Sequence, residues 1–192
     1  MTSPSVPAAS QSVSASPSPA APSSETAPAA RPALSLPDAA LVEEACKKSG
    51  LIWIAVPGAR DRVAWHVWHE QDGHGAVYVV VGGGEQTVPG LADGITVRVT
   101  VRSKDKGGRL VAWPGTVARI LPDSEEWGAV VPALHAKRLN AHDGEAQPER
   151  WAANSAVFRI RPQGDLYEGP GRYATASGAA PVPPSPATTR SL

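Results

Sequence analysis

The 192-residue sequence contains one cysteine and one phenylalanine, and it has no long apolar run. The single cysteine, Cys46, excludes an internal disulfide and a zinc site built from cysteines. No apolar segment approaches the roughly 20 residues that a membrane-spanning helix needs, so we expect no membrane partner. The first residues lack the basic and apolar regions of a secretory signal. These absences together predict a cytoplasmic protein.

The sequence also lacks an excess of charge of either sign, because 18 basic residues balance 18 acidic ones. Since no basic block stands out, we expect no nucleic-acid partner. His66 and His69 are three residues apart and would point to opposite faces of a strand, so no metal site is predicted. The sequence has no Walker loop, no HExxH pattern and no Ser-His-Asp pattern, and it therefore identifies no catalytic residue.

Composition divides the chain into three parts. Residues 1–35 are almost entirely Ser, Pro and Ala, which leaves too little apolar bulk to offset the entropy of ordering them. Residues 163–192 are again rich in Gly, Pro, Ala and Ser. We expect both tails to be disordered. One domain remains, residues 36–162, and it has the commonest domain size.

Two helices are predicted in this domain. Ser35 is followed by Pro and Asp two and three residues later, which is typical of a helix start, and Gly50 marks the expected stop. The second helix is expected to follow Ser124, where two glutamates suit the positive end of a helix. Pro132 should kink or split this second helix. The stretch from Glu145 to Trp151 is interpreted as a loop.

Six segments have the alternation or the β-branched residues that are typical of strands. Turns such as Pro57-Gly58 and Asp72-Gly73 separate them, and no helix is expected between the first five. This order favours a mainly β protein with flanking helices, built as an antiparallel barrel. The predicted strands are residues 51–56, 63–71, 76–81, 95–102, 110–121 and 156–160.

Three consecutive glycines, Gly82, Gly83 and Gly84, follow the third predicted strand. Glycine admits a positive φ and lets a backbone approach a ligand closely. Three glycines at a strand end can also expose N–H groups that bind an anion. The alternative interpretation is a flexible loop or a β-bulge.

Basic residues gather along one predicted strand and the turn after it. Such a row is either a solvated sheet face or a phosphate-binding patch, since Arg and Lys on a rigid strand can hold a phosphoryl group. The residues of this row are Arg98, Arg102, Lys104, Lys106 and Arg109.

Trp65 and Trp68 are expected on opposite faces of one strand, which therefore has apolar bulk on both sides. One face would fill the barrel. The other would meet a partner subunit, because an exposed apolar strand face is an aggregation hazard. Coverage of that outer face by the helices is the alternative.

Short stretches within residues 38–162 have the residue pattern of one known family, and they are residues 50–54, 62–65, 79–86, 89–91, 101–104, 108–111, 115–117 and 136–140. They resemble the pyridoxamine 5'-phosphate oxidase-like split-barrel family, in particular its actinobacterial members. The resemblance implies a six-stranded antiparallel split β-barrel. It also implies a homodimer that holds FMN or the deazaflavin F420 in the cleft between its subunits.

The resemblance further implies a set of site residues. Family members bind the cofactor phosphate with an Arg on the second strand, which Arg62 matches, and with a Ser-x-Lys segment after the third strand. Here that segment reads Gly82-Gly83-Gly84-Glu85-Gln86 and lacks both residues. The family's Arg-Gln pair that opens the fifth strand reads Arg109-Leu110 here. The cofactor-binding candidates are therefore Arg62, Gly82, Gly83, Gly84, Gln86 and Arg109.

The segment from Gly82 to Gln86, which contains Glu85, is where the chain departs most clearly from this family pattern. The negative charge of Glu85 would oppose a phosphate bound at the loop unless the side chain points away. Backbone N–H groups of the glycines could replace part of the lost side-chain contacts.

Two functions follow as hypotheses. The first is a flavin- or F420-binding oxidoreductase of the pyridoxamine 5'-phosphate oxidase-like type, in which the cofactor supplies the redox chemistry. The second is a non-enzymatic dimeric module that has lost the redox cofactor and binds haem or another ligand. The missing Ser-x-Lys segment motivates the second hypothesis.

Overall fold

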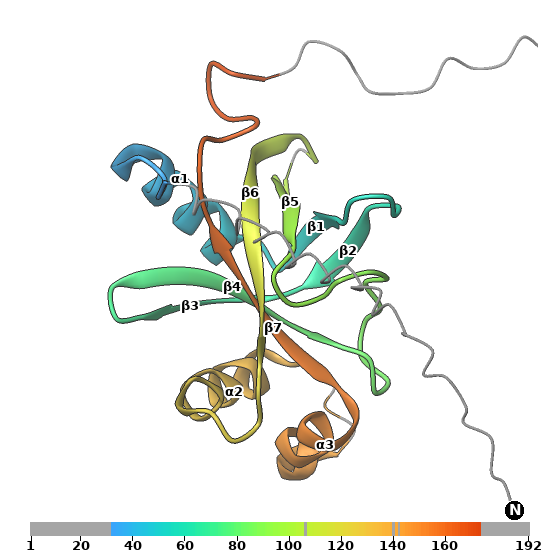
Figure 1. Ribbon diagram of the computed structural model, residues 1–192. Coiled ribbons are helices and arrows are strands. Elements are labelled where there is room, and N and C mark those ends of the chain that lie inside the picture. The colour runs from blue at the N-terminus through green and yellow to red at the C-terminus, as the bar shows by residue number, and fades with distance from the viewer. Residues whose placement is uncertain (1–31, 106, 140, 142, 174–192) are drawn as a thin grey trace, which may run out of the picture. The chain divides into compact units, whose positions relative to one another are not determined.

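The computed structural model describes residues 32–105, 107–139, 141 and 143–173 (Figure 1). Residues 1–31 and 174–192, which make up most of the two predicted tails, lie outside the described residues, as does Lys106. The elements of the described part are α1 (Leu36–Lys48), β1 (Leu51–Ala55), β2 (Arg62–Trp65), β3 (Val67–Gln71), β4 (His74–Val81), β5 (Thr96–Arg102), β6 (Arg109–Ile120), α2 (Glu125–Lys137), the 3-10 turn η1 (Gly144–Ala146), α3 (Gln147–Asn154) and β7 (Ala156–Pro162).

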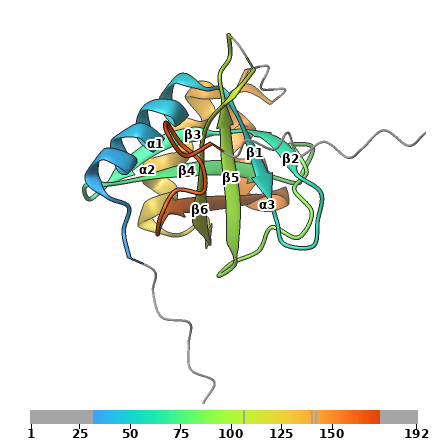
Figure 2. The same ribbon diagram turned by 90° about the horizontal axis from the view of Figure 1, so that it is seen from above.

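All described strands belong to one antiparallel sheet of seven strands in the order β2-β1-β5-β6-β7-β4-β3. Its two outermost strands, β2 and β3, are consecutive in the chain, and only His66 separates them. The sheet must therefore curl until its edges meet at this residue, and Figures 1 and 2 show the resulting curvature. The predicted fold class, mainly β with flanking helices and an antiparallel barrel, is confirmed.

The difference between six predicted segments and seven strands arises at His66. The predicted strand 63–71 is divided there into β2 and β3, which pair with different neighbours. His66 is buried, and its Nε2 lies 3.0 Å from the carbonyl oxygen of Cys46 in the last turn of α1. The bend is thus fixed to the end of a helix.

Gln86 supports the same bend from the other side. Its Oε1 accepts a hydrogen bond from the Trp65 N–H at 2.7 Å, and its Nε2 donates to the Trp65 carbonyl at 2.9 Å. The carboxamide therefore takes the place of a neighbouring strand, and it satisfies both backbone groups of Trp65 where β2 ends.

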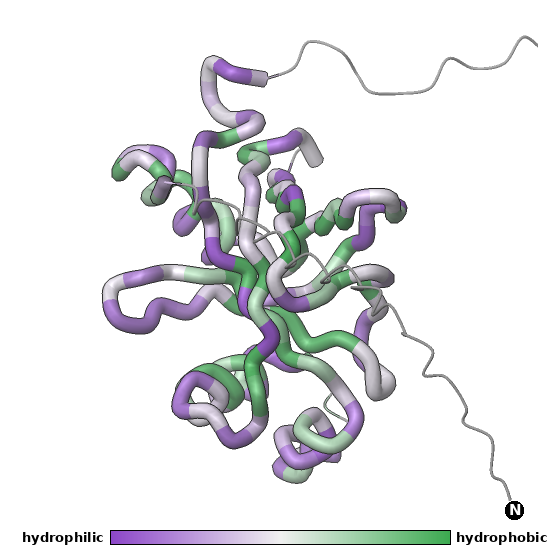
Figure 3. Tube along the Cα trace, in the orientation of Figure 1, coloured by the Kyte–Doolittle hydropathy of each residue, from purple (hydrophilic) through white to green (hydrophobic). Residues whose placement is uncertain are grey.

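Apolar side chains form two clusters on opposite sides of the sheet. Val77 and Val79 of β4 belong to the first cluster, which lies between the strands and α1. Tyr78 and Val80 belong to the second, which lies between the sheet and helices α2 and α3. β4 is therefore buried on both faces, which explains its nearly continuous apolar sequence. Figure 3 shows the hydrophobic residues concentrated along the strands.

The two predicted helices are present. The Ser35 side chain accepts a hydrogen bond from the Asp38 N–H at 3.3 Å and caps α1. The helix ends before Ser49, whose extended backbone terminates it one residue earlier than the predicted stop at Gly50. Pro132 does not split α2, because buried residues on both sides of it pack into the second cluster while the proline itself is exposed. Among the described residues, no helix is long and apolar enough to cross a bilayer.

The stretch interpreted as a loop, Glu145 to Trp151, instead contains η1 and the first part of α3. Pro148 suits the first turn of a helix, and Trp151 is fully buried in the second cluster. The interpretation was wrong because tertiary burial of one tryptophan, rather than a long apolar pattern, stabilises this eight-residue helix.

The last strand ends at Pro162, where the sequence predicted the end of the domain, but contacts with the domain continue to Tyr173. Leu166 is buried in the first cluster. Glu168 forms an isolated bridge with Ala112 of β6. The described segment after β7 is therefore packed on the barrel.

The buried His66 predicts a pH dependence of stability. Burial lowers the pKa of His66 from 6.5 to about 4, against a smaller opposing effect of its hydrogen bond to the Cys46 carbonyl. The unfolded chain therefore takes up the proton first as the pH falls. The contribution of the neutral His66 to the stability of the fold is fully present above pH 6.5 and is lost as the pH falls towards 4. Between about pH 7.5 and pH 4.5 the free energy of unfolding of the wild type should fall. We expect this fall to be smaller by about 2–3 kcal/mol in His66→Gln.

Urea unfolding of both proteins at the two pH values measures this difference. His69→Gln is the control, because His69 is not among the buried residues. Equal pH dependence in the wild type and the His66 variant would contradict the assignment.

Candidate functional site

The glycine loop after β4 is a tight turn packed against the start of β7. Gly82, Gly83 and Gly84 have φ values of 83°, 58° and 85°, a region that favours glycine. A Cβ on Gly83 would lie 2.4 Å from the Ser155 Oγ and 2.6 Å from the Asn154 carbonyl oxygen, so no side chain fits there. The glycines therefore meet a packing requirement. The Gly83 and Gly84 N–H groups donate to no acceptor within the described part of the chain.

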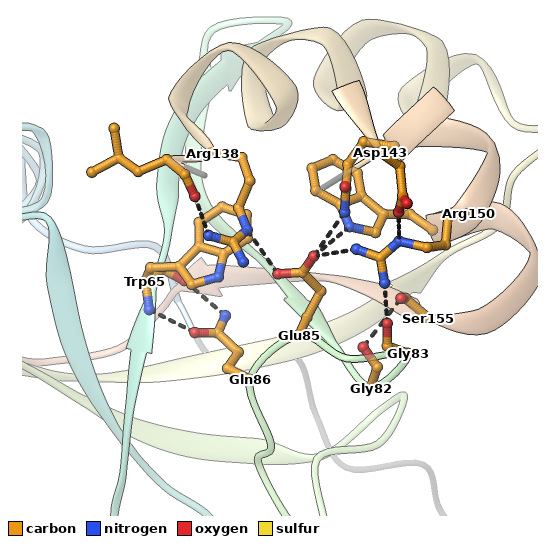
Figure 4. Close-up of polar contacts among 12 residues, drawn as sticks. Trp65, Gly82, Gly83, Glu85, Gln86, Arg138, Asp143, Arg150 and Ser155 are labelled. Carbon is orange, nitrogen blue, oxygen red and sulfur yellow. Dashed lines mark hydrogen bonds and ion pairs between the residues drawn. The ribbon is translucent and has the colours of Figure 1, made fainter. Parts of the chain in front are cut away.

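Glu85 points from this loop into the protein, and no part of its side chain is exposed to solvent (Figure 4). Four side chains donate to its carboxylate: Arg138 at 2.9 Å, Gln147 at 2.8 Å, and Arg150 and Trp151 at 3.0 Å each. Two cations and two neutral donors thus offset the cost of burying the charge. The carboxylate does not oppose an anion at the loop in the way that the sequence alone suggested.

Arg138 connects this network to the surface. Its guanidinium group lies 5.6 Å from the centre of the Trp65 ring, and it also donates to the Leu139 carbonyl. A cation over an indole face is stabilised by the ring quadrupole. Glu85 and Trp65 together therefore fix the position of Arg138.

Trp65 and Arg138 line a cleft of about 690 Å³. Residues 46–51, 65–68 and 137–139 form its walls, so it lies where the ends of α1 and α2 meet the bend at His66. Trp68 adds a second indole, and the absence of a side chain on Gly75 leaves room for its ring. A volume of this size is typical of small-molecule sites.

Three of the four cations in the cleft wall are paired. The side-chain nitrogen of Lys47 lies 2.6 Å from a carboxylate oxygen of Glu43, and that of Lys48 lies 2.5 Å from one of Glu44. The Nε of Arg138 lies 2.9 Å from a carboxylate oxygen of Glu85. Among the described residues, the exposed Lys137 has no carboxylate within ion-pair distance. Lys137 therefore supplies the unneutralised positive charge of the cleft.

His66 brings a different chemistry to the same wall. Since its pKa is low, the ring is neutral near pH 7, and its Nε2–H donates to the Cys46 carbonyl. The lone pair then resides on Nδ1, which is buried and has no hydrogen-bond partner among the described residues. Such a nitrogen can accept a hydrogen bond or coordinate a metal.

The six residues that the resemblance selected do not all come together within one chain. Gly82–Gly84 and Gln86 share the loop, and Gln86 reaches the cleft through Trp65. The exposed Arg62 begins β2, and within the described part no hydrogen bond or ion pair joins it to the loop. Arg109 and the loop lie towards opposite ends of the 12-residue β6, which spans about 35 Å. A site that includes all six residues requires a second copy of the chain and stays a prediction.

The predicted basic row is divided between two roles. Arg98 and Arg109 each lie 3.0 Å from a carboxylate oxygen of the buried Glu168. These two arginines therefore attach the segment after β7 to the barrel. Arg102 and Lys104 do not take part in this contact and face a separate cavity.

Sequence reasoning missed Lys137 and Arg138 as cleft residues and Glu168 as an ion-pair partner. The two cations were visible as basic residues at the end of an apolar helical pattern, but that position is equally explained by the helix dipole. Glu168 lies in the part predicted to be a tail, and no local pattern marked it.

No family profile matches the sequence, and no curated protein matches it. Solved structures give distant likenesses. The haem storage protein HutZ from Vibrio cholerae has 14% identity and a TM-score of 0.45, covering 68% of this chain and 92% of its own. A NimC/NimA family protein from Clostridium acetobutylicum has 18% identity and a TM-score of 0.41, covering 64% and 78%. An FAD- and haem-binding protein from Mycobacterium smegmatis has 15% identity and a TM-score of 0.37, covering 77% and 91%. At these values the likenesses assign neither a family nor a function to the chain.

The buried carboxylate generates a prediction for stability. Glu85→Gln leaves the mostly buried Arg138 without a carboxylate partner and leaves Arg150 with Asp143 alone. We therefore expect a loss of about 3–5 kcal/mol in the free energy of unfolding. Urea unfolding at neutral pH measures the loss. Glu43→Gln is the matched control, because the Glu43–Lys47 pair is largely in water and its removal should cost much less. An unchanged urea midpoint for Glu85→Gln would contradict the role given to this carboxylate.

Proposed function

We propose that the protein is a cofactor-binding split-barrel protein that holds a flavin or deazaflavin in the cleft and acts as an FMN- or F420-dependent oxidoreductase. The observation that carries the proposal is the composition of the cleft. It combines the indole side chains of Trp65 and Trp68 with the unneutralised cation of Lys137. A flavin nucleotide has the matching parts, a planar aromatic ring and an anionic phosphate.

The residues of the cleft fit such a group. Leu51 and Leu139 are 48% and 79% exposed, and a bound ring would cover this apolar surface. Lys137 would hold the phosphate, and the paired Arg138 would add positive charge beside Trp65. When bound, a flavin or deazaflavin supplies the hydride-transfer chemistry. The chain then has to bind and orient the cofactor, which agrees with a sequence that contains no catalytic motif.

Titration of the purified full-length protein with FMN, FAD and F420 tests this proposal. We expect at least one of them to bind at tens of micromolar or tighter. Lys137→Gln should weaken binding about tenfold, because a hydrogen bond to a charged group is lost. Arg119→Gln is the matched control, since Arg119 is exposed on β6 outside the cleft lining. If none of the three binds, the proposal is wrong.

A second candidate function is favoured by His66. A neutral imidazole can act as an axial ligand of haem iron, and the Nδ1 of His66 has no other partner among the described residues. Since this nitrogen is buried, haem binding would have to expose it to the cleft. The apolar and aromatic walls of the cleft suit a porphyrin, and Lys137 suits a propionate group. In that case the protein would be a non-enzymatic haem-binding protein, which is the second hypothesis from the sequence.

Reconstitution with haem distinguishes the two candidates. If His66 is the ligand, the wild type should give a Soret band shifted from that of free haem. His66→Gln should lose this band while His69→Gln keeps it. Circular dichroism of each variant checks that it is folded. A wild-type spectrum identical to that of free haem would refute the haem candidate and leave the flavin proposal standing.

A further inference from the structure

A second cavity of about 410 Å³ lies beside the cleft and shares residues 49–51 with it. Its remaining lining includes Trp53, Arg102 and Lys104. Trp53 follows Leu51 by two residues on the same face of β1, about 7 Å further along the strand. One elongated ligand can therefore occupy both cavities by passing the start of β1.

The second cavity has a positioned cation. The Arg102 guanidinium carbon lies 5.2 Å from the centre of the Trp53 ring, and its Nε donates to the Gly107 carbonyl at 2.8 Å. Within the described part of the chain, no carboxylate lies within ion-pair distance of Arg102 and no acceptor is bonded to its two terminal nitrogens. These nitrogens form the planar fork that matches a phosphate.

The backbone also directs Arg102 to this place. The pairing register of β5 and β6 shifts between Val101 and Arg102. Such irregularities redirect a side chain at the end of a ladder. The neighbouring arginines of the basic row, Arg98 and Arg109, are bound to Glu168, so Arg102 differs from them in having its fork available.

We infer that the second cavity binds the second phosphate and the base of a dinucleotide. Arg102 takes the phosphate and Trp53 supplies the aromatic surface for the base. This inference rests on the proposed function, because it places the flavin ring and the first phosphate in the cleft. It keeps the flavin ring of the proposed function but replaces the mononucleotide FMN, and F420, with a flavin dinucleotide as the preferred cofactor.

Calorimetric titration of the full chain with FMN and FAD tests the inference. We expect FAD to bind about tenfold more tightly than FMN. Arg102→Gln should weaken FAD binding about tenfold and change FMN binding less than about twofold. AMP should compete with FAD and leave FMN bound. Arg119→Gln should change neither affinity, and Arg102→Lys, which keeps the charge without the fork, replaces Arg102→Gln if that variant fails to fold.

Several outcomes would overturn the inference. If FMN and FAD bind equally and the Arg102 variants alter neither, the second cavity is not a subsite, while the proposed function stands. If F420 binds more tightly than FMN but AMP does not compete with FAD, the cavity takes an acidic tail instead of a nucleotide. If the Arg102 variants change the sedimentation of the protein and not its FAD affinity, the cavity is an interface between copies. If neither flavin binds, both the inference and the proposed function fail.

Discussion

The buried carboxylate of Glu85 is the constraint on which the candidate site depends. It accepts hydrogen bonds from α3 and from Arg138 just after α2, while its own backbone belongs to the glycine loop. A buried charge is tolerated only when all its donors are in place, so these three segments must be assembled together. The position of Arg138 over Trp65 is a consequence of this network. One wall of the cleft is therefore set by burial of a charge.

The cleft itself exists because the barrel closes through a bend. At His66 the chain leaves β2 and enters β3, so neither strand continues past this residue and a gap is left beside the bend. The last turns of α1 and α2 both reach this gap and direct the negative ends of their helix dipoles towards it. Lys47, Lys48 and Lys137 offset those dipoles. Part of the positive charge of the cleft therefore serves to stabilise the helix ends. Since carboxylates pair with Lys47 and Lys48, Lys137 is the lysine that is available to a ligand.

The sequence predicted the parts of the fold that depend on local patterns. Alternation and turn residues located the strands, and the cap at Ser35 located α1. The bend at His66 was not predictable, because alternation on both sides of it reads as one strand. The sequence also left the role of the three glycines open, because the atoms that forbid a Cβ on Gly83 belong to residues 154 and 155, far away in the chain. Pairs such as Glu85 with Arg138, 53 positions apart, leave no local signal.

The negative charge within the glycine loop, residues 82–86, is explained by the two arginines that it pairs with. A lysine in place of Glu85 would put a third cation beside Arg138 and Arg150, which like-charge repulsion disfavours. The loop and the two arginines therefore form one electrostatic unit that depends on the negative charge of Glu85. A phosphate bound by one copy of this chain must find its side-chain cation outside the loop. Lys137 and Arg102, which have no carboxylate partner among the described residues, are the cations that the two cavities offer.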